Sequence, residues 1–133
     1  MDDVVFRFPV RVYWEDTDAG GVVFYANYLK FFERARTEWL RSRGFGQQAL
    51  REREGLIFVV TDTTVRYRQP ARLDDLLEAT VAVRSARAAS LVIAQQALRA
   101  GRALAEGEIR IGCVDAETFR PQRIPTHLLE ALG

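Results

Sequence analysis

A stripe of large aromatic residues follows the spacing of one long helix, and it constrains how the chain can fold. Its apolar positions recur at intervals of three and four, which is typical of one face of an α-helix. They are Tyr28, Phe31, Phe32, Ala35 and Trp39. Gly44 is a natural stop for this helix, and Arg41 and Arg43 suit its negative end. A stripe this wide needs a deep concave surface to cover it, so the rest of the chain is expected to supply one.

The other segments have the alternation or composition of β-strands. Residues 4–14 alternate, with Phe6, Phe8, Val10 and Val12 on one face, and Pro9 indicates a position near an edge or a bend. Four further strands are expected at 56–69, 76–86, 90–100 and 103–116. Short helices are expected at 46–54, where a turn is the alternative, and in the tail 126–132. Closely spaced strands favour an antiparallel sheet, so we predict an α+β domain with the helix on one face of a curled sheet. A second copy of the chain would cover the remaining sheet face and edges.

Composition excludes several broad classes of function. With 19 basic and 18 acidic residues the formal net charge is +1, which gives no bulk attraction to nucleic acid or to an anionic membrane surface. Cys113 is the single cysteine, so no intrachain disulfide framework can form, which fits a reducing compartment. Asp2, Asp3 and Arg7 interrupt the N-terminus before an apolar run develops, and no stretch approaches the ~18 apolar residues of a membrane span. A cytoplasmic protein without an integral membrane segment is therefore expected.

Metal and nucleophile motifs are scarce in the chain. His127 is the only histidine and lies near the C-terminus, so a histidine-based metal site or a Ser-His-Asp arrangement is not expected. Cys113 falls in a strand pattern, where a lone cysteine is more often a small buried hydrophobe than a nucleophile. The glycine pair at 20–21 has neither the spacing nor the context of a dinucleotide fingerprint. We therefore expect no cofactor and no metal.

A cluster of acids, Glu15, Asp16 and Asp18, lies between the first strand and the long helix. One interpretation is a polar turn, since Asp and Gly are turn residues. An Asp-x-Asp calcium loop is a further alternative, but the acidic spacing does not continue as such a loop requires. The other uses the start of the helix, whose free backbone N–H groups can hold an oxyanion on a carbonyl substrate. Gly20 and Gly21 would let the backbone approach that substrate. Asp18 would then attack an activated acyl group such as a thioester, or draw a proton from water.

The stretch VRVYWEDTDAGGVVFYANYLKFFERARTEWLR resembles the signature of hotdog-fold acyl-CoA thioesterases of the 4-hydroxybenzoyl-CoA thioesterase class. It is most similar to the Tol-Pal-associated acyl-CoA thioesterase group. The segments FVVTDTTVRYRQPARLDDLLEATVAVRSARAASLVIAQQALR and GEIRIGCVDAETFRPQRIP resemble the sheet and the ending of that group, so nearly the whole chain is covered. The resemblance implies a single hotdog domain over residues 1–133, with a five- or six-stranded antiparallel sheet wrapped around one long helix. It also implies dimers, often paired into tetramers, with active sites at the subunit interface.

The resemblance also implies which residues act. The acid after the dipeptide DT is the catalytic carboxylate of the family and corresponds to Asp18, while the backbone near Tyr25 and Ala26 would supply the oxyanion hole. Many members have a histidine in the stretch VVYHANY, where this chain reads VVFYANY and has Tyr25. A phenol can donate a hydrogen bond but is a poor base near neutral pH. Tyr25 is therefore expected either to support catalysis or to pack at the start of the helix.

Three functions are compatible with these features. The leading one is hydrolysis of an acyl-CoA, or of an acyl group on a carrier protein, to a free acid and a thiol. The missing histidine keeps open a non-catalytic acyl-thioester or acyl-carrier-protein binding or scaffold protein, although a mere binder does not need Asp18 beside an uncharged thioester. A dehydratase acting on hydroxyacyl thioesters usually needs a histidine with the acid. Four strand arginines are either ligands for the CoA phosphates or solvent-facing side chains: Arg66, Arg68, Arg84 and Arg87.

Overall fold

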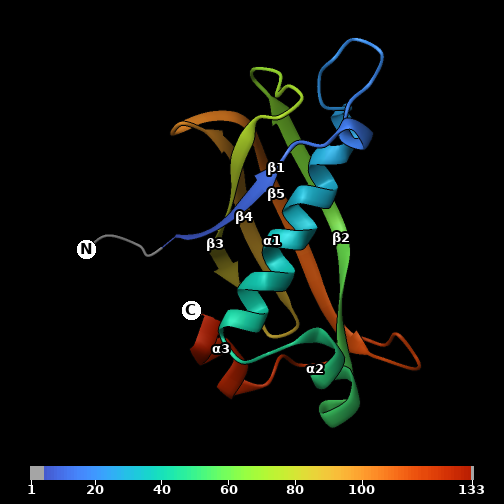
Figure 1. The fold of residues 1–133 in the computed structure, drawn as a ribbon. Coiled ribbons are helices and arrows are strands. Elements are labelled where there is room, and N and C mark those ends of the chain that lie inside the picture. The colour runs from blue at the N-terminus through green and yellow to red at the C-terminus, as the bar shows by residue number, and fades with distance from the viewer. Residues whose placement is uncertain (1–4, 133) are drawn as a thin grey trace.

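Five strands form one antiparallel sheet that curves around the long helix α1 (Figure 1). The structure, a computed structural model, describes residues 5–132. The strands are β1 (Phe6–Arg11), β2 (Leu56–Tyr67), β3 (Leu76–Ala86), β4 (Ser90–Arg99) and β5 (Arg102–Asp115). The α+β prediction with an antiparallel sheet is confirmed. Asp2, Asp3 and Val4, on which two of the expectations partly depended, lie outside the described residues.

Three α-helices and two short 3-10 helices complete the part of the chain that the structure describes. They are η1 (Trp14–Asp16), η2 (Tyr25–Asn27), α1 (Tyr28–Ser42), α2 (Gln47–Glu54) and α3 (Thr126–Leu132). The long helix ends just before Gly44, whose φ of 88° is in the left-handed region that glycine adopts without strain. Among residues 5–132, no helix is both long enough and apolar enough to cross a membrane.

The aromatic stripe of α1 is the centre of the hydrophobic core. All five stripe positions are buried, and they pack with buried aliphatic side chains of the sheet such as Leu77 and Val81 of β3 and Ile93 of β4. Gly107 of β5 lies directly under the helix, because a Cβ at this position would be 2.9 Å from the ring of Phe32. Burial of each large apolar side chain contributes about 1.5–3 kcal/mol, so the stripe is a main source of stability.

One polar side chain is buried beneath the helix and ties it to the sheet. The side-chain amide of Gln95 donates to the carbonyl oxygens of Phe32 at 3.0 Å and Thr80 at 3.1 Å. Its oxygen accepts a hydrogen bond of 2.9 Å from Arg36 of α1. Desolvation by burial lowers the pKa of Arg36, with nearby Glu33 opposing the shift. These bonds link α1 to the inner strands β3 and β4.

The two edges of the sheet differ in length. The strand order is β1-β3-β4-β5-β2, so β1 and β2 are the edge strands. Strand β1 has six residues and carries Pro9, which confirms the edge position predicted from the sequence. Strand β2 has 12 residues and pairs only with β5 within the described part of the chain. A long edge strand of this kind leaves one row of backbone groups available for pairing.

Candidate active site

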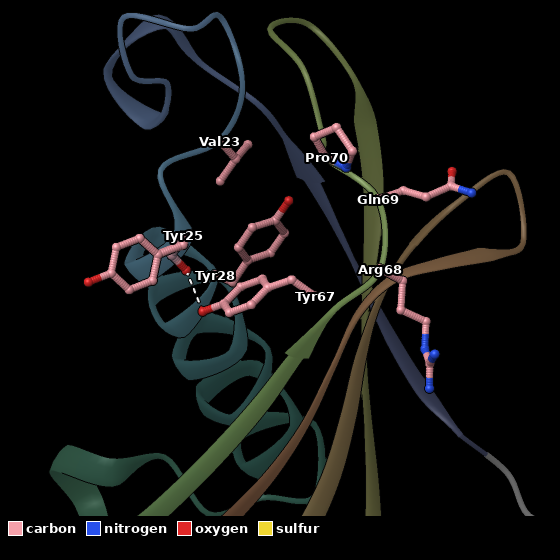
Figure 2. Close-up of a pocket in the computed structure, with 7 residues that line it drawn as sticks. All are labelled: Val23, Tyr25, Tyr28, Tyr67, Arg68, Gln69 and Pro70. Carbon is pink, nitrogen blue, oxygen red and sulfur yellow. Dashed lines mark hydrogen bonds between the residues drawn. The ribbon is translucent and has the colours of Figure 1, made fainter.

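The start of α1 borders a cleft lined by three tyrosines, as Figure 2 shows. Its walls are Val23, Tyr25 and Tyr28 near the start of the helix, and Tyr67, Arg68, Gln69 and Pro70 around the end of β2. We call this cleft the tyrosine pocket; its volume is about 270 Å³. The ring centroid of Tyr67 lies 6.2 Å from the ring centroid of Tyr25 and 5.5 Å from that of Tyr28. A largely carbon-lined cleft of this size can hold an acyl group.

Two successive peptide groups at the start of the helix have their carbonyls held and their N–H groups free. The Phe24 carbonyl accepts a hydrogen bond of 2.8 Å from the Asn27 N–H, and the Tyr25 carbonyl accepts one of 2.8 Å from the Tyr67 hydroxyl. The N–H groups of Tyr25 and Ala26 have no hydrogen-bond acceptor among residues 5–132. A helix start with free N–H groups favours negative charge nearby. These are the two N–H groups assigned to the oxyanion hole from the resemblance.

Asp18 lies in a tight loop between η1 and η2, and this loop projects beyond the start of α1 (Figure 1). A bridge between Thr17 and Val23 closes the loop, so Asp18 and the start of η2 flank the same bridge. Oδ1 of Asp18 accepts a hydrogen bond of 2.8 Å from the Gly20 N–H, and the carboxylate is exposed. In the single chain Asp18 lies outside the lining of the tyrosine pocket. The backbone at Asp18 therefore forms the polar turn expected from the sequence, and the carboxylate on this turn is accessible to a substrate.

The glycine pair shapes this turn around the carboxylate. Gly21 has φ of 77°, a conformation that L side chains rarely adopt, and its N–H donates to the Asp18 carbonyl at 3.0 Å. A Cβ at position 20 would lie 3.1 Å from Oδ1 of Asp18. Both glycines are exposed, so they leave the loop open on its outer side.

Asp16 has a different environment from Asp18, although only one residue separates them. Its side chain is 5% exposed and accepts hydrogen bonds from the Tyr13 N–H at 2.8 Å and from the Asn27 side chain at 2.7 Å. Its carbonyl accepts a third bond, from the Phe24 N–H at 3.0 Å. Asp16 thus fastens the loop to the start of the helix. The sequence analysis did not select Asn27. Its only signal in the sequence is that it is a polar residue among the apolar residues at the start of the helix.

The three pocket tyrosines differ in their surroundings. Burial raises the pKa of Tyr28, although its hydroxyl accepts a hydrogen bond of 3.1 Å from the Ala71 N–H. Partial burial, with Tyr25 and Tyr28 beside it, also raises the pKa of Tyr67. The Tyr25 side chain is 64% exposed at the mouth of the pocket and contacts the Phe24 ring. Tyr67 was not selected from the sequence, because nothing in a strand pattern relates it to a helix that begins about 40 residues earlier.

The remaining candidates from the sequence lie elsewhere or are paired. Arg68 forms an ion pair with Glu106 at 2.9 Å, and Arg84 forms one with Glu108 at 3.5 Å. Arg68 and Gln69 point away from the tyrosine rings (Figure 2), and Arg66 and Arg84 line a separate hollow on the sheet. Burial, with a contribution from Glu54, raises the pKa of the Cys113 thiol, which agrees with a small buried hydrophobe.

His127 lies far from this site. It belongs to α3, which is at the opposite end of the molecule from the start of α1 in Figure 1. Its Nε2 lies 3.5 Å from the carboxylate of Glu54 at the end of α2. His127 is therefore separated from the acidic loop and from the tyrosine pocket.

Comparison with known proteins gives a consistent result. Residues 12–132 match the thioesterase-like superfamily. Acyl-CoA thioester hydrolase YbgC from Escherichia coli O6:H1 is 48% identical over 97% of this chain and 96% of its own. Acyl-CoA thioesterase YbgC from Haemophilus influenzae is 44% identical over 98% of this chain and 96% of its own. The crystal structure of a probable thioesterase from Bartonella henselae has a TM-score of 0.88 and 35% identity, and covers 92% of this chain and 100% of that chain.

Proposed function

Because the chain belongs to the thioesterase-like superfamily, we propose that it hydrolyses acyl-CoA thioesters to a free acid and a free thiol. Its fold is the hotdog fold, an antiparallel sheet wrapped around one long helix. One observation carries the proposal for the site. The N–H groups of Tyr25 and Ala26 have no acceptor among residues 5–132, Tyr25 lines a cleft of about 270 Å³, and the loop just before them carries the exposed carboxylate of Asp18.

The helix start would act as the oxyanion hole. When an oxygen nucleophile adds to the thioester carbonyl, negative charge develops on the carbonyl oxygen. The N–H groups of Tyr25 and Ala26 are available to donate to that oxygen, and the dipole of α1 has its positive end there. Both N–H groups belong to a short turn that is already held by other bonds, so little reorganisation is needed as the charge forms.

Asp18 would supply the reactive oxygen or activate it. As a general base, its carboxylate takes a proton from water while the water oxygen bonds to the carbonyl carbon. The tetrahedral intermediate then collapses, the C–S bond breaks, and the thiolate takes up a proton. As a nucleophile, Asp18 would instead displace the thiolate and form a mixed anhydride that water hydrolyses. The exposed position of the carboxylate suits either route, since no bond to a buried donor opposes its approach to substrate.

The direct experiment is release of free thiol from a panel of acyl-CoAs with short, long and aromatic acyl groups, together with an acylated carrier protein. Hydrolysis yields one acid for each thiol, whereas a dehydratase yields an unsaturated thioester that the product mass identifies. Binding of a thioester without release of thiol would replace the proposal by the scaffold alternative. Association with the Tol-Pal system and a cytoplasmic location are predictions from the sequence and its resemblance.

We also propose that the chain forms a homodimer through the edge strand β2, with pairing of dimers into tetramers as the further state implied by the resemblance. This 12-residue strand has one unpaired side among the residues described, and Val60 on it is 50% exposed. Edge strands of such length are usually covered in stable proteins, and a twofold axis lets two copies cover each other. Apolar side chains near the start of α1 are exposed as well: Trp14, Phe24 and Leu29. The partner would therefore also close the mouth of the site.

Light scattering at micromolar concentration is expected to give at least twice the 15.1 kDa mass of one chain. Val60→Lys should lower the mass, because pairing of the edge strands would have to bury a charged side chain. Leu76→Lys is the matched control, since Leu76 is 52% exposed but lies on β3 away from this edge. A wild-type chain that is monomeric at this concentration would contradict the dimer.

Substitution at Tyr25 tests whether its side chain supports catalysis or only packs. Tyr25→Phe is expected to lower the rate two- to tenfold, roughly the effect of one neutral hydrogen bond. Tyr25→His restores the residue common in the family and should add a pH dependence near about 6.5, the ordinary pKa of histidine. The measurement is a pH–rate profile of thiol release. Profiles of both variants that overlay the wild type would limit this side chain to packing.

A further inference from the structure

The two peptide groups of the proposed oxyanion hole are held in different ways. The carbonyl of the first, between Phe24 and Tyr25, is held by Asn27 within the same 3-10 turn. The carbonyl of the second, between Tyr25 and Ala26, is held by Tyr67, a side chain 42 residues away in the sequence. This side-chain contact ties the second peptide to strand β2. No other side chain among the described residues donates to either carbonyl.

The planarity of the peptide relates this contact to catalysis. In a trans peptide the C=O and N–H bonds point in opposite directions, so a donor that holds the Tyr25 carbonyl also fixes the direction of the Ala26 N–H. It restricts rotation about the backbone of Tyr25 as well, and hence the angle between the two free N–H groups. A hydrogen bond to the carbonyl oxygen also polarises the peptide, which makes its N–H a stronger donor.

Tyr67 is well placed to hold this peptide firmly. It is the last residue of β2, and the next residue, Arg68, donates its N–H to the Leu104 carbonyl at 2.8 Å. Its ring packs against the rings of Tyr25 and Tyr28, in an edge-on arrangement with Tyr25 (Figure 2). Both constraints fix the hydroxyl relative to the helix start. The raised pKa keeps this hydroxyl protonated, and therefore a donor, throughout the neutral range.

We propose that Tyr67 is a positioning residue of the thioesterase: its hydroxyl holds the Tyr25–Ala26 peptide so that the two free N–H groups converge on the developing oxyanion. This inference rests on the proposed function. A group that only orients the oxyanion donors acts when charge develops on the carbonyl oxygen. Its loss should therefore affect the chemical step more than the binding of substrate.

The test is Tyr67→Phe, which keeps the ring and removes only the hydroxyl. We expect kcat for thiol release to fall roughly three- to tenfold, the effect of losing one orienting hydrogen bond. KM and the affinity for a non-hydrolysable thioether analogue of the substrate should remain within about twofold, since the aromatic ring that lines the pocket at position 67 is retained. Tyr13→Phe is the matched control, because it removes a hydroxyl from a tyrosine that is 61% exposed and outside the pocket. Its kcat should equal that of the wild type.

Two results would overturn the positioning role. One is a Tyr67→Phe variant with the kcat of the wild type. The other is a variant that loses substrate affinity and thermal stability along with kcat, since that pattern marks a general packing residue. Failure of the proposed function is recognised separately from the wild-type chain alone. If that chain releases no thiol from any acyl-CoA, both the thioesterase and the positioning role of Tyr67 are excluded.

Discussion

Asp18→Asn is expected to lower kcat for thiol release by at least ~100-fold while the protein remains folded. The substitution removes the anion that acts as base or nucleophile. It preserves the turn, because the structural contact of this side chain is one hydrogen bond from the Gly20 N–H to Oδ1, which an asparagine oxygen also accepts. The measurement pairs turnover at saturating acyl-CoA with the melting temperature, and only turnover should change.

An exposed carboxylate elsewhere serves as the control for this experiment. Glu117 is exposed in the turn after β5, away from the tyrosine pocket and from the proposed dimer edge, so Glu117→Gln also removes a surface charge but should leave kcat unchanged. Near wild-type turnover in Asp18→Asn would exclude Asp18 from the mechanism.

Asp16→Ala is expected to affect stability, which Asp18→Asn leaves unchanged, with a loss of about 2–4 kcal/mol in the free energy of unfolding. The buried carboxylate accepts from the Tyr13 N–H and from the Asn27 side chain, and alanine would leave both donors without an acceptor. Each unsatisfied buried donor costs roughly 1–3 kcal/mol. Urea unfolding monitored by circular dichroism measures the loss, with Asp18→Asn as the control that should unfold like the wild type.

The conservative change Asp16→Asn separates the structural role from a catalytic one. One amide oxygen can accept from one of the two donors, while the amide nitrogen faces the other, so stability should fall but less turnover should be lost than in Asp18→Asn. Equal loss of turnover in well-folded Asp16→Asn would contradict the role of Asp16 in loop structure. Unchanged unfolding of Asp16→Ala would contradict the importance of its two hydrogen bonds.

Much of the fold was predictable from the sequence because its determinants are local. The helix stripe from Tyr28 to Trp39 follows from a period of 3.6 residues, and the inward face of β3 follows from a period of two. Gly44 ends the helix and Pro9 lies on an edge strand, each as its own backbone chemistry requires. Periodicity identifies which face of an element is apolar, and a single helix with a wide apolar face needs a curved sheet to bury it.

The two acids of the segment DTD show what a local pattern leaves open. Asp16 and Asp18 have the same residue type and nearly the same neighbours, and either can form a turn. In the folded chain Asn27 and the Tyr13 backbone meet Asp16 and bury it, while Asp18 remains exposed on the loop. The resemblance to a family distinguished them beforehand, whereas spacing and composition did not.

The sequence by itself determined the elements of this protein, their apolar faces and the acidic loop ahead of the helix, because these depend on residues within a few positions of each other. Only the tertiary structure decided that Tyr67 holds the Tyr25 carbonyl across 42 residues, and that Gln95 is buried under Phe32. Both contacts need the sheet to curve until distant segments lie against the helix. The strength of a hydrogen bond depends on a separation of about 3 Å that no spacing along the chain encodes.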